Sequence, residues 1–302
     1  PPRHRAPDPH PPTNALPRTG RMKRQNTRTA SQGSVFQITI FFLYIIAGAM
    51  FAATRLPRYS SQTGMLLVVA VAAGLTGALW HAWTLWMLVV GSNSFSLSIG
   101  STASFIGLLL SLTAIVGAAE STLRGLSGGL LVLAALVAVM TSGNLPAEPG
   151  APLSWQIQSH ILISLAAYGL LTVGAIVAIY ALIQEKRLQA RRLSSINQLF
   201  APMETAEKLL FGITSAGFLT LLVAVSTGFA FVDDLFSQHL VHKTALSLLA
   251  LTLFGLLLVA RRFAGWRGKR AVYLYLWGFL ILCLAYFGTR YVLEEILGRS
   301  WS

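Results

Sequence analysis

Cysteine and charge are both scarce in this chain of 302 residues, and each scarcity excludes a class of function. The single cysteine, Cys283, lies inside an apolar run, which excludes an intramolecular disulfide, a Cys-x-x-Cys redox pair and a thiolate cluster. Charged residues make up 11% of the chain, whereas a soluble domain carries about 25%. Together with 54% hydrophobic residues, this composition predicts a polytopic membrane protein.

Catalytic motifs are missing as well. No G-x-G-x-x-G, P-loop or Ser-His-Asp pattern stands in a suitable context, and no pair of intramembrane carboxylates suggests a proton relay. We therefore predict no catalytic residue and, at most, assistance in delivering a cofactor. The net charge of +13 is concentrated in the N-terminal segment and a few short loops. It thus indicates topology and contact with the lipid bilayer, and no nucleic-acid binding.

Hydropathy divides the chain into a polar segment, one membrane domain and a tail. We expect residues 1–34, basic and rich in Pro, to be disordered, with Met22 a candidate start. Residues 35–295 should form one all-α membrane bundle, and 296–302 a short tail. About 20 apolar residues span a bilayer as a helix. The chain offers eight such spans: Val35–Ala53, Met65–Val90, Thr102–Ala119, Leu126–Thr141, 161–183, Leu210–Val232, Thr244–Ala260 and Ala271–Val292.

Two further features of the sequence concern the ends of the spans and the contacts between them. The second half of loop 184–209 is expected to form a short interfacial helix. Small residues allow helices to approach closely in membranes. We therefore expect six glycines to serve helix packing: Gly74, Gly77, Gly107, Gly117, Gly128 and Gly129.

Basic residues alternate between the loops in a way that predicts the orientation of the bundle. Loops 54–63, 120–125, 184–209 and 261–270 hold thirteen Lys and Arg residues, whereas loops 91–101, 142–157 and 233–243 hold only Lys243. Because basic loops favour the cytoplasm, the first set is assigned to the cytoplasmic side of the membrane. Both termini are then predicted on the outer side.

With this topology, four histidines gather in the outer half of the membrane. His160 opens the fifth span, and His239 and His242 precede the seventh. His81 lies sixteen residues into the second span, about 24 Å along a helix at 1.5 Å per residue. Imidazole is a good ligand of haem iron, and aromatic rings can wall a porphyrin. The candidate site is therefore a haem-iron site: His160, His242 and His81, with Trp155 and Trp80 beside them.

Each of these residues also has a structural interpretation. His81 could hydrogen-bond a backbone carbonyl, and His239 could be a solvated loop residue. Trp155 could belong to the aromatic belt found at the interfaces of any membrane protein. Asp233 and Asp234 are interpreted as the polar end of the sixth span.

Several motifs resemble the cytochrome c assembly family, the CcsA- and HemX-like membrane proteins, in the branch called YpjD. They include HILISLAAYGLL at the fifth span, APMETAEKLLFGIT before the sixth, and GWRG with AYFGTR around the last. Weaker matches are His81-Ala82 and LSIGSTASFIG. The resemblance covers roughly residues 38–295. His160 matches the outer histidine of the family pattern, and Lys243 matches the lysine that opens the seventh span.

The resemblance implies a bacterial membrane protein that handles haem, held as b-type haem, and presents it to an apocytochrome or another cytochrome-assembly protein. The full assembly factors carry a W-G-x-x-W-x-W-D outer segment, which this chain lacks in its outer loops. The departure favours a haem-binding or accessory relative over a complete synthase. The alternative is a cofactor-free accessory or scaffold subunit of a membrane complex such as an ion transporter.

Overall fold

The computed structural model describes residues 19–89, 99–140, 154–189, 202–231 and 238–285, and all regular structure among them is helical. Two short 3-10 turns, Pro57–Gln62 and Ser121–Leu123, connect neighbouring helices. The helices are α1 (Thr19–Ala53), α2 (Thr63–Val89), α3 (Ile99–Gly117), α4 (Arg124–Met140), α5 (Trp155–Gln189), α6 (Met203–Phe231), α7 (Gln238–Phe263) and α8 (Gly268–Cys283).

Large apolar side chains cover the outside of the helices. Leu79 is 72% exposed and Leu219 is 59% exposed, and both lie well inside long apolar helices. A soluble protein rarely presents so much contiguous apolar surface. Seven of the described helices, α1 to α7, are long and apolar enough to cross a membrane. The prediction of an all-α membrane bundle of about eight spans is therefore confirmed.

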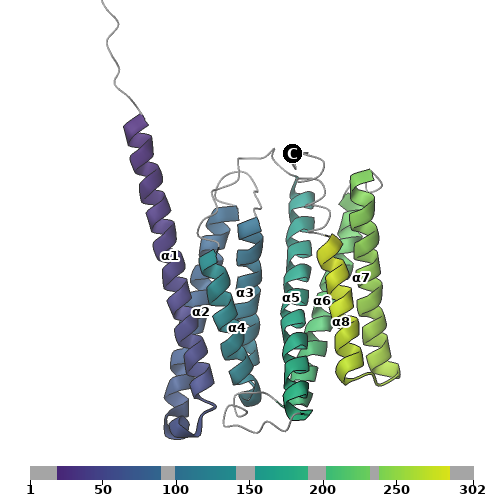
Figure 1. Cartoon of the computed structure of the whole chain (residues 1–302). Coiled ribbons are helices and arrows are strands. Elements are labelled where there is room, and N and C mark those ends of the chain that lie inside the picture. Colours follow the sequence, from purple (N-terminus) through teal and green to yellow (C-terminus); the bar gives the residue numbers. More distant parts are fainter. Residues whose placement is uncertain (1–18, 90–98, 141–153, 190–201, 232–237, 286–302) are drawn as a thin grey trace, which may run out of the picture.

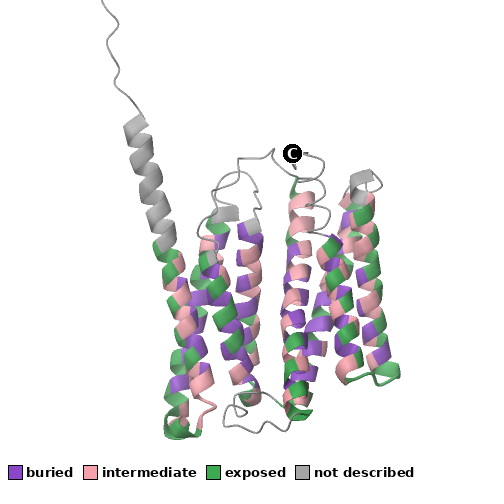
Figure 2. Ribbon diagram, in the orientation of Figure 1, coloured by how far each residue is buried: buried purple, intermediate pink, exposed green. Residues whose placement is uncertain are grey.

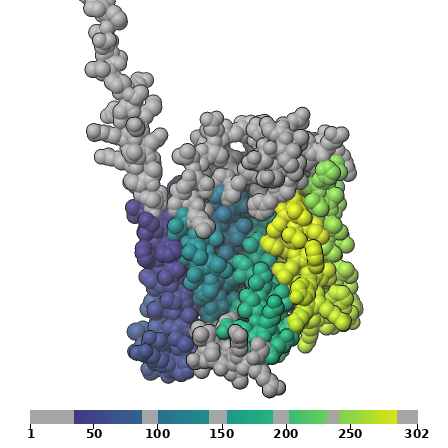
Figure 3. All heavy atoms as spheres, viewed as in Figure 1, coloured from purple at the N-terminus to yellow at the C-terminus, as the bar shows by residue number. Residues whose placement is uncertain are grey.

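The helices form two groups of four that lie side by side (Figures 1 and 3). In the first group α1 packs on α2 and α4, and α3 packs on the same two helices. In the second, α5 and α7 each pack on α6 and α8. Helix α5 also contacts α3, so it joins the two groups. The stretch with the longest uninterrupted apolar run thus becomes the central helix of the bundle.

Small residues line the helix contacts inside both groups. Ala47, Ala114 and Ala134 are fully buried in the first group, and Ala178 and Ala250 in the second. Figure 2 shows that the buried stretches of the ribbons, in purple, alternate with exposed ones along the helices. Lipid tails are as apolar as leucine, so close backbone packing, not simple burial of apolar area, holds such helices together.

The helix ends separate the loops into two sets. The α1–α2, α3–α4 and α7–α8 connections all lie at the end of the bundle opposite the start of α5 (Figure 1). This end carries the basic residues of the short loops, among them Arg58, Arg124 and Arg270. The grouping of the basic loops matches the prediction, whereas the side of the membrane is not set by the fold alone.

Two local expectations differ from the structure. Helix α1 begins at Thr19, so residues 19–34 are helical instead of disordered; residues 1–18 lie outside the described residues. The last Pro before the span is Pro17, and a polar segment without Pro can extend an existing helix at little cost. Met203–Leu209 is the first part of α6, not a separate interfacial helix. The tail 296–302 also lies outside the described residues.

Candidate functional site

His160 lies near the start of α5, where the end of α6 packs against it. Its Nδ1 is 3.1 Å from Oγ1 of Thr227 on α6, and the ring is half-buried. The next residue of α6, Gly228, leaves room for the imidazole. A Cβ built on Gly228 would lie 3.1 Å from Cε1 of His160. The glycine therefore lets α6 seat the ring against its backbone.

The hydrogen bonds around His160 define its tautomer. The Thr227 hydroxyl donates to the Ala224 carbonyl at 2.9 Å, so its oxygen accepts from the imidazole. The Thr227 contact therefore places the proton on Nδ1. A neutral imidazole protonated at Nδ1 carries its lone pair on Nε2.

Aromatic and cationic groups stand beside this imidazole. Trp155, the first residue of α5, is 71% exposed, and its ring lies 6.3 Å from that of Phe231 at the end of α6. Lys243, near the start of α7, interacts electrostatically with the His160 ring. Three helices therefore converge at this end of the second group, with one histidine, one lysine and a flat apolar face.

His81 lies in the other group of helices and is fully engaged there. It is 2% exposed, and its Nδ1 is 3.1 Å from the Tyr44 hydroxyl of α1. Its Nε2 is 2.8 Å from the Ser104 hydroxyl of α3. The Tyr44 hydroxyl donates onward to Ser111 at 3.0 Å, and Ser111 to the Leu108 carbonyl. Both ring nitrogens are used, which supports the structural interpretation of this residue.

The remaining predicted residues are not brought into one cluster. Trp80 packs on Phe36 with ring centroids 5.7 Å apart, in the first group of helices. His242 is exposed on α7, next to Lys243. His239 lies in α7 but its side chain, like Asp233 and Asp234, is outside the description. Among the described residues no group of three His, Cys, Asp or Glu side chains could hold a metal ion.

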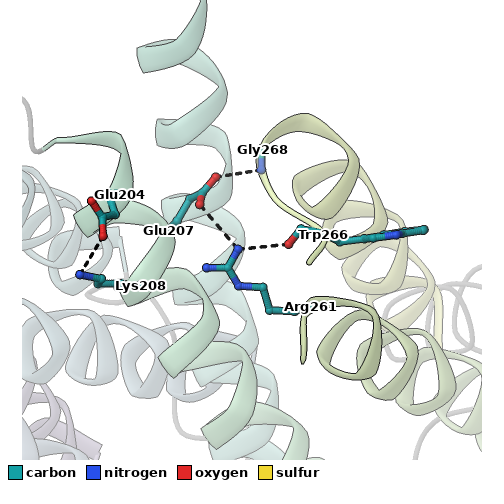
Figure 4. A network of polar contacts seen from close by, with 6 residues as sticks. All are labelled: Glu204, Glu207, Lys208, Arg261, Trp266 and Gly268. Atoms are coloured by element: carbon teal, nitrogen blue, oxygen red, sulfur yellow. Dashed lines mark hydrogen bonds and ion pairs between the residues drawn. The ribbon is translucent and has the colours of Figure 1, made fainter. Parts of the chain in front are cut away.

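A second polar cluster lies at the opposite end of the same helices (Figure 4). The Glu207 carboxylate of α6, 8% exposed, accepts a 2.8 Å hydrogen bond from the backbone amide of Gly268, where α8 begins. It also pairs with Arg261 of α7 at 3.9 Å. Arg261 donates to the Trp266 carbonyl at 3.2 Å and lies over the Phe211 ring at 4.4 Å.

Sequence reasoning identified the two motifs of this cluster without joining them. Glu207 is the second of the two acidic residues of APMETAEKLLFGIT, and Gly265 to Gly268 form GWRG. Gly265 and Gly268 have φ angles of 64° and 61°, the left-handed region that favours glycine. Nothing in the sequence pointed to the contact between this turn and α6.

Comparison with known proteins gives one family. The family model described as Cytochrome C assembly protein matches residues 70–297, about three quarters of the chain. The match covers α3 to α8 entirely and most of α2.

Individual relatives agree with it. "Inner membrane protein YpjD" from Escherichia coli K12 is 28% identical over 271 residues, which is 87% of this chain and 99% of that protein. An "Uncharacterized 28.8 kDa protein in nifR3-like 5'region" from Azospirillum brasilense is 32% identical over 151 residues, 49% of this chain and 55% of that protein. No solved structure matches the chain.

Proposed function

Because the chain belongs to the cytochrome c assembly protein family, we propose that it binds haem, with His160 as a ligand of the iron. The observation that carries the proposal is the tautomer of His160. The Thr227 hydroxyl donates to the Ala224 carbonyl and accepts from Nδ1 of His160, so the ring carries its lone pair on Nε2. Histidines that bind metals usually donate their other ring N–H in this way.

The other predicted residues differ in how well they are placed to contact a haem group beside His160. Trp155 with Phe231 offers an apolar face for the porphyrin. Exposed His242 on α7 is the better second ligand, because His81 would first have to give up its bond to Ser104. Bound haem would supply an iron that accepts imidazole nitrogen. We assign Trp80 a supporting role at most, since it packs on Phe36 in the other helix group.

The proposed role is to hold haem and hand it on. No covalent step by this chain is proposed. The partner would be an apocytochrome or another cytochrome-assembly protein, met at the end of the bundle where α5 begins. Lys243 would contribute a positive charge there, which suits the carboxylates of a haem group.

The first test is the absorption spectrum of the full chain, purified in mild detergent from a haem-replete host. We expect a Soret band and sharp reduced α and β bands, typical of b-type haem. His160→Ala should lose most of the Soret absorbance, because it removes the free imidazole nitrogen. His81→Gln is the matched control, a buried histidine of the other helix group, and should keep the band.

Two outcomes would contradict the proposal. Loss of the band in His81→Gln but not in His160→Ala would move the site to the first group of helices. A colourless protein that also fails to bind added hemin would favour the cofactor-free accessory subunit. That alternative is supported by the saturated hydrogen bonds of His81. Copurifying proteins would then identify its complex.

We also propose that the chain lies in the bacterial cytoplasmic membrane with its basic loops inside. The relative from E. coli is described as an inner membrane protein, and basic loops favour the cytoplasm. Both termini would then be outside. Alkaline phosphatase, which is active outside the cytoplasm, should be active when fused after Ser302 and inactive when inserted at Gly265. The opposite pattern would reverse the orientation.

A further inference from the structure

The α7–α8 turn and the end of α5 form a shallow groove with a strongly basic lining. Arg267, Lys269 and Arg270 contribute positive charge, and Glu185 of α5 contributes one negative charge. Lys269 pairs with Glu185 at 3.4 Å, so these two charges offset each other. No described residue forms an ion pair with Arg267 or Arg270, and both are exposed. The groove therefore presents two positive charges, of which Arg267 also interacts electrostatically with Glu204, a residue already paired with Lys208.

The backbone of this groove is held in place by the Glu207 cluster. Glu207 accepts from the Gly268 amide, and Arg261 donates to the Trp266 carbonyl. The two glycines with positive φ close the turn between them. The Glu207 carboxylate already accepts a hydrogen bond from the first amide of α8. The positive charge of the groove therefore comes from the arginine side chains and not from the N-terminus of the helix. A ligand would meet a preformed surface, which lowers the entropic cost of binding.

An apolar strip on α8 continues from the basic groove. Tyr273, Leu276, Trp277 and Leu280 line a second shallow depression, in which Tyr273 is 50% exposed and Trp277 61% exposed. Tyr273 and Trp277 follow Arg270 by three and seven residues, so they lie on the same side of the helix as Arg270. Tyr and Trp are typical of the interface between headgroups and acyl chains. Positive charge and an exposed apolar stripe thus follow one another along the same helix.

We propose that this surface binds one anionic phospholipid. Its phosphate lies against Arg267 and Arg270, and one acyl chain lies along Tyr273 and Trp277. Charge complementarity selects an anionic headgroup over a zwitterionic one. The apolar strip selects a lipid over a free phosphate, because only a lipid fills both parts. The site is independent of haem and lies at the opposite end of α5 from His160.

The test is native mass spectrometry of the full chain in mild detergent at low salt, with dioleoyl phosphatidylglycerol added. We expect one bound phosphatidylglycerol, retained over phosphatidylcholine. Each arginine near a lipid surface contributes about 1 kcal/mol. Arg267→Gln with Arg270→Gln should therefore weaken binding about ten- to thirty-fold. Trp277→Ala should weaken binding of the lipid without changing its preference for an anionic headgroup.

The matched control is Lys186→Gln with Arg262→Gln, which removes two exposed basic residues near the groove but outside its lining. It should leave phosphatidylglycerol binding within about twofold of the unchanged chain, since neither residue touches the site. An equal loss in this control would mean diffuse charge attraction and would overturn the site. Equal binding of phosphatidylcholine would overturn it as well. Displacement of the lipid by millimolar inorganic phosphate would replace it with a small-anion site.

Discussion

Replacing Glu207 by alanine is expected to lower the free energy of unfolding by about 2–3 kcal/mol, because it removes a buried charged acceptor. The carboxylate is 8% exposed and serves two partners from different elements, the Gly268 amide and the Arg261 guanidinium. Its loss leaves the first amide of α8 without an acceptor. Arg261 keeps the Trp266 carbonyl and the Phe211 ring, so it stays in position with its charge uncompensated.

Glu204 provides the matched control for this prediction, one turn earlier on the same helix (Figure 4). It pairs with Lys208 at 3.0 Å, but both side chains are more than two-thirds exposed. Exposed pairs contribute little to stability, so Glu204→Ala should leave the unfolding midpoint unchanged. Glu207→Gln keeps an oxygen for the Gly268 amide and should be intermediate. The measurement is unfolding of the purified protein in mixed detergent micelles. Equal midpoints for Glu204→Ala and Glu207→Ala would show that the cluster does not hold α6, α7 and α8 together.

The membrane spans could be predicted because hydropathy and length act within one segment at a time. Bilayer thickness sets the number of apolar residues, and the backbone must satisfy its own hydrogen bonds in lipid. The exact ends of the helices were less predictable than the spans. Helix α6 begins at Met203 instead of Leu210, because the polar residues before the apolar run continue the helix and place Glu207 against the α7–α8 turn.

The candidate site was only partly predictable for a related reason. Depth in the membrane follows from position along a helix, so His160 could be placed at one end of α5. Which histidines share a neighbourhood depends on which helices pack together. His81 is engaged by Tyr44 and Ser104, in a group of helices that does not contain His160. Thr227, which orients His160 from 67 residues away, has no signal in the sequence.

The glycines of the first helix group illustrate the same limit. Gly128 and Gly129 are adjacent in sequence, and both were expected to allow close packing. In the structure they face in different directions. A Cβ on Gly128 would lie 2.7 Å from the Gly48 carbonyl oxygen of α1, whereas a Cβ on Gly129 would meet nothing within 4 Å. The expectation therefore holds for Gly128 and is wrong for Gly129, because composition does not reveal which face of α4 meets α1.

Gly128→Leu is accordingly expected to lower the free energy of unfolding by about 3 kcal/mol, while Gly129→Leu leaves it unchanged or slightly raised. The obstacle at Gly128 is backbone: its Cβ would meet the Gly48 carbonyl oxygen, and a Cβ on Gly48 would lie 2.9 Å from the Gly128 oxygen. No side chain can rotate away, so α1 and α4 must separate along their contact.

Both variants gain the same side chain and the same helix propensity, so the difference between their stabilities isolates the close approach of α1 to α4. If Gly128→Leu does not accumulate in the membrane, Gly128→Ala, which adds the Cβ alone, should still unfold at a lower midpoint than Gly129→Ala in mixed micelles. Equal stability of the two members of each pair would mean that α1 and α4 do not pack through these glycines.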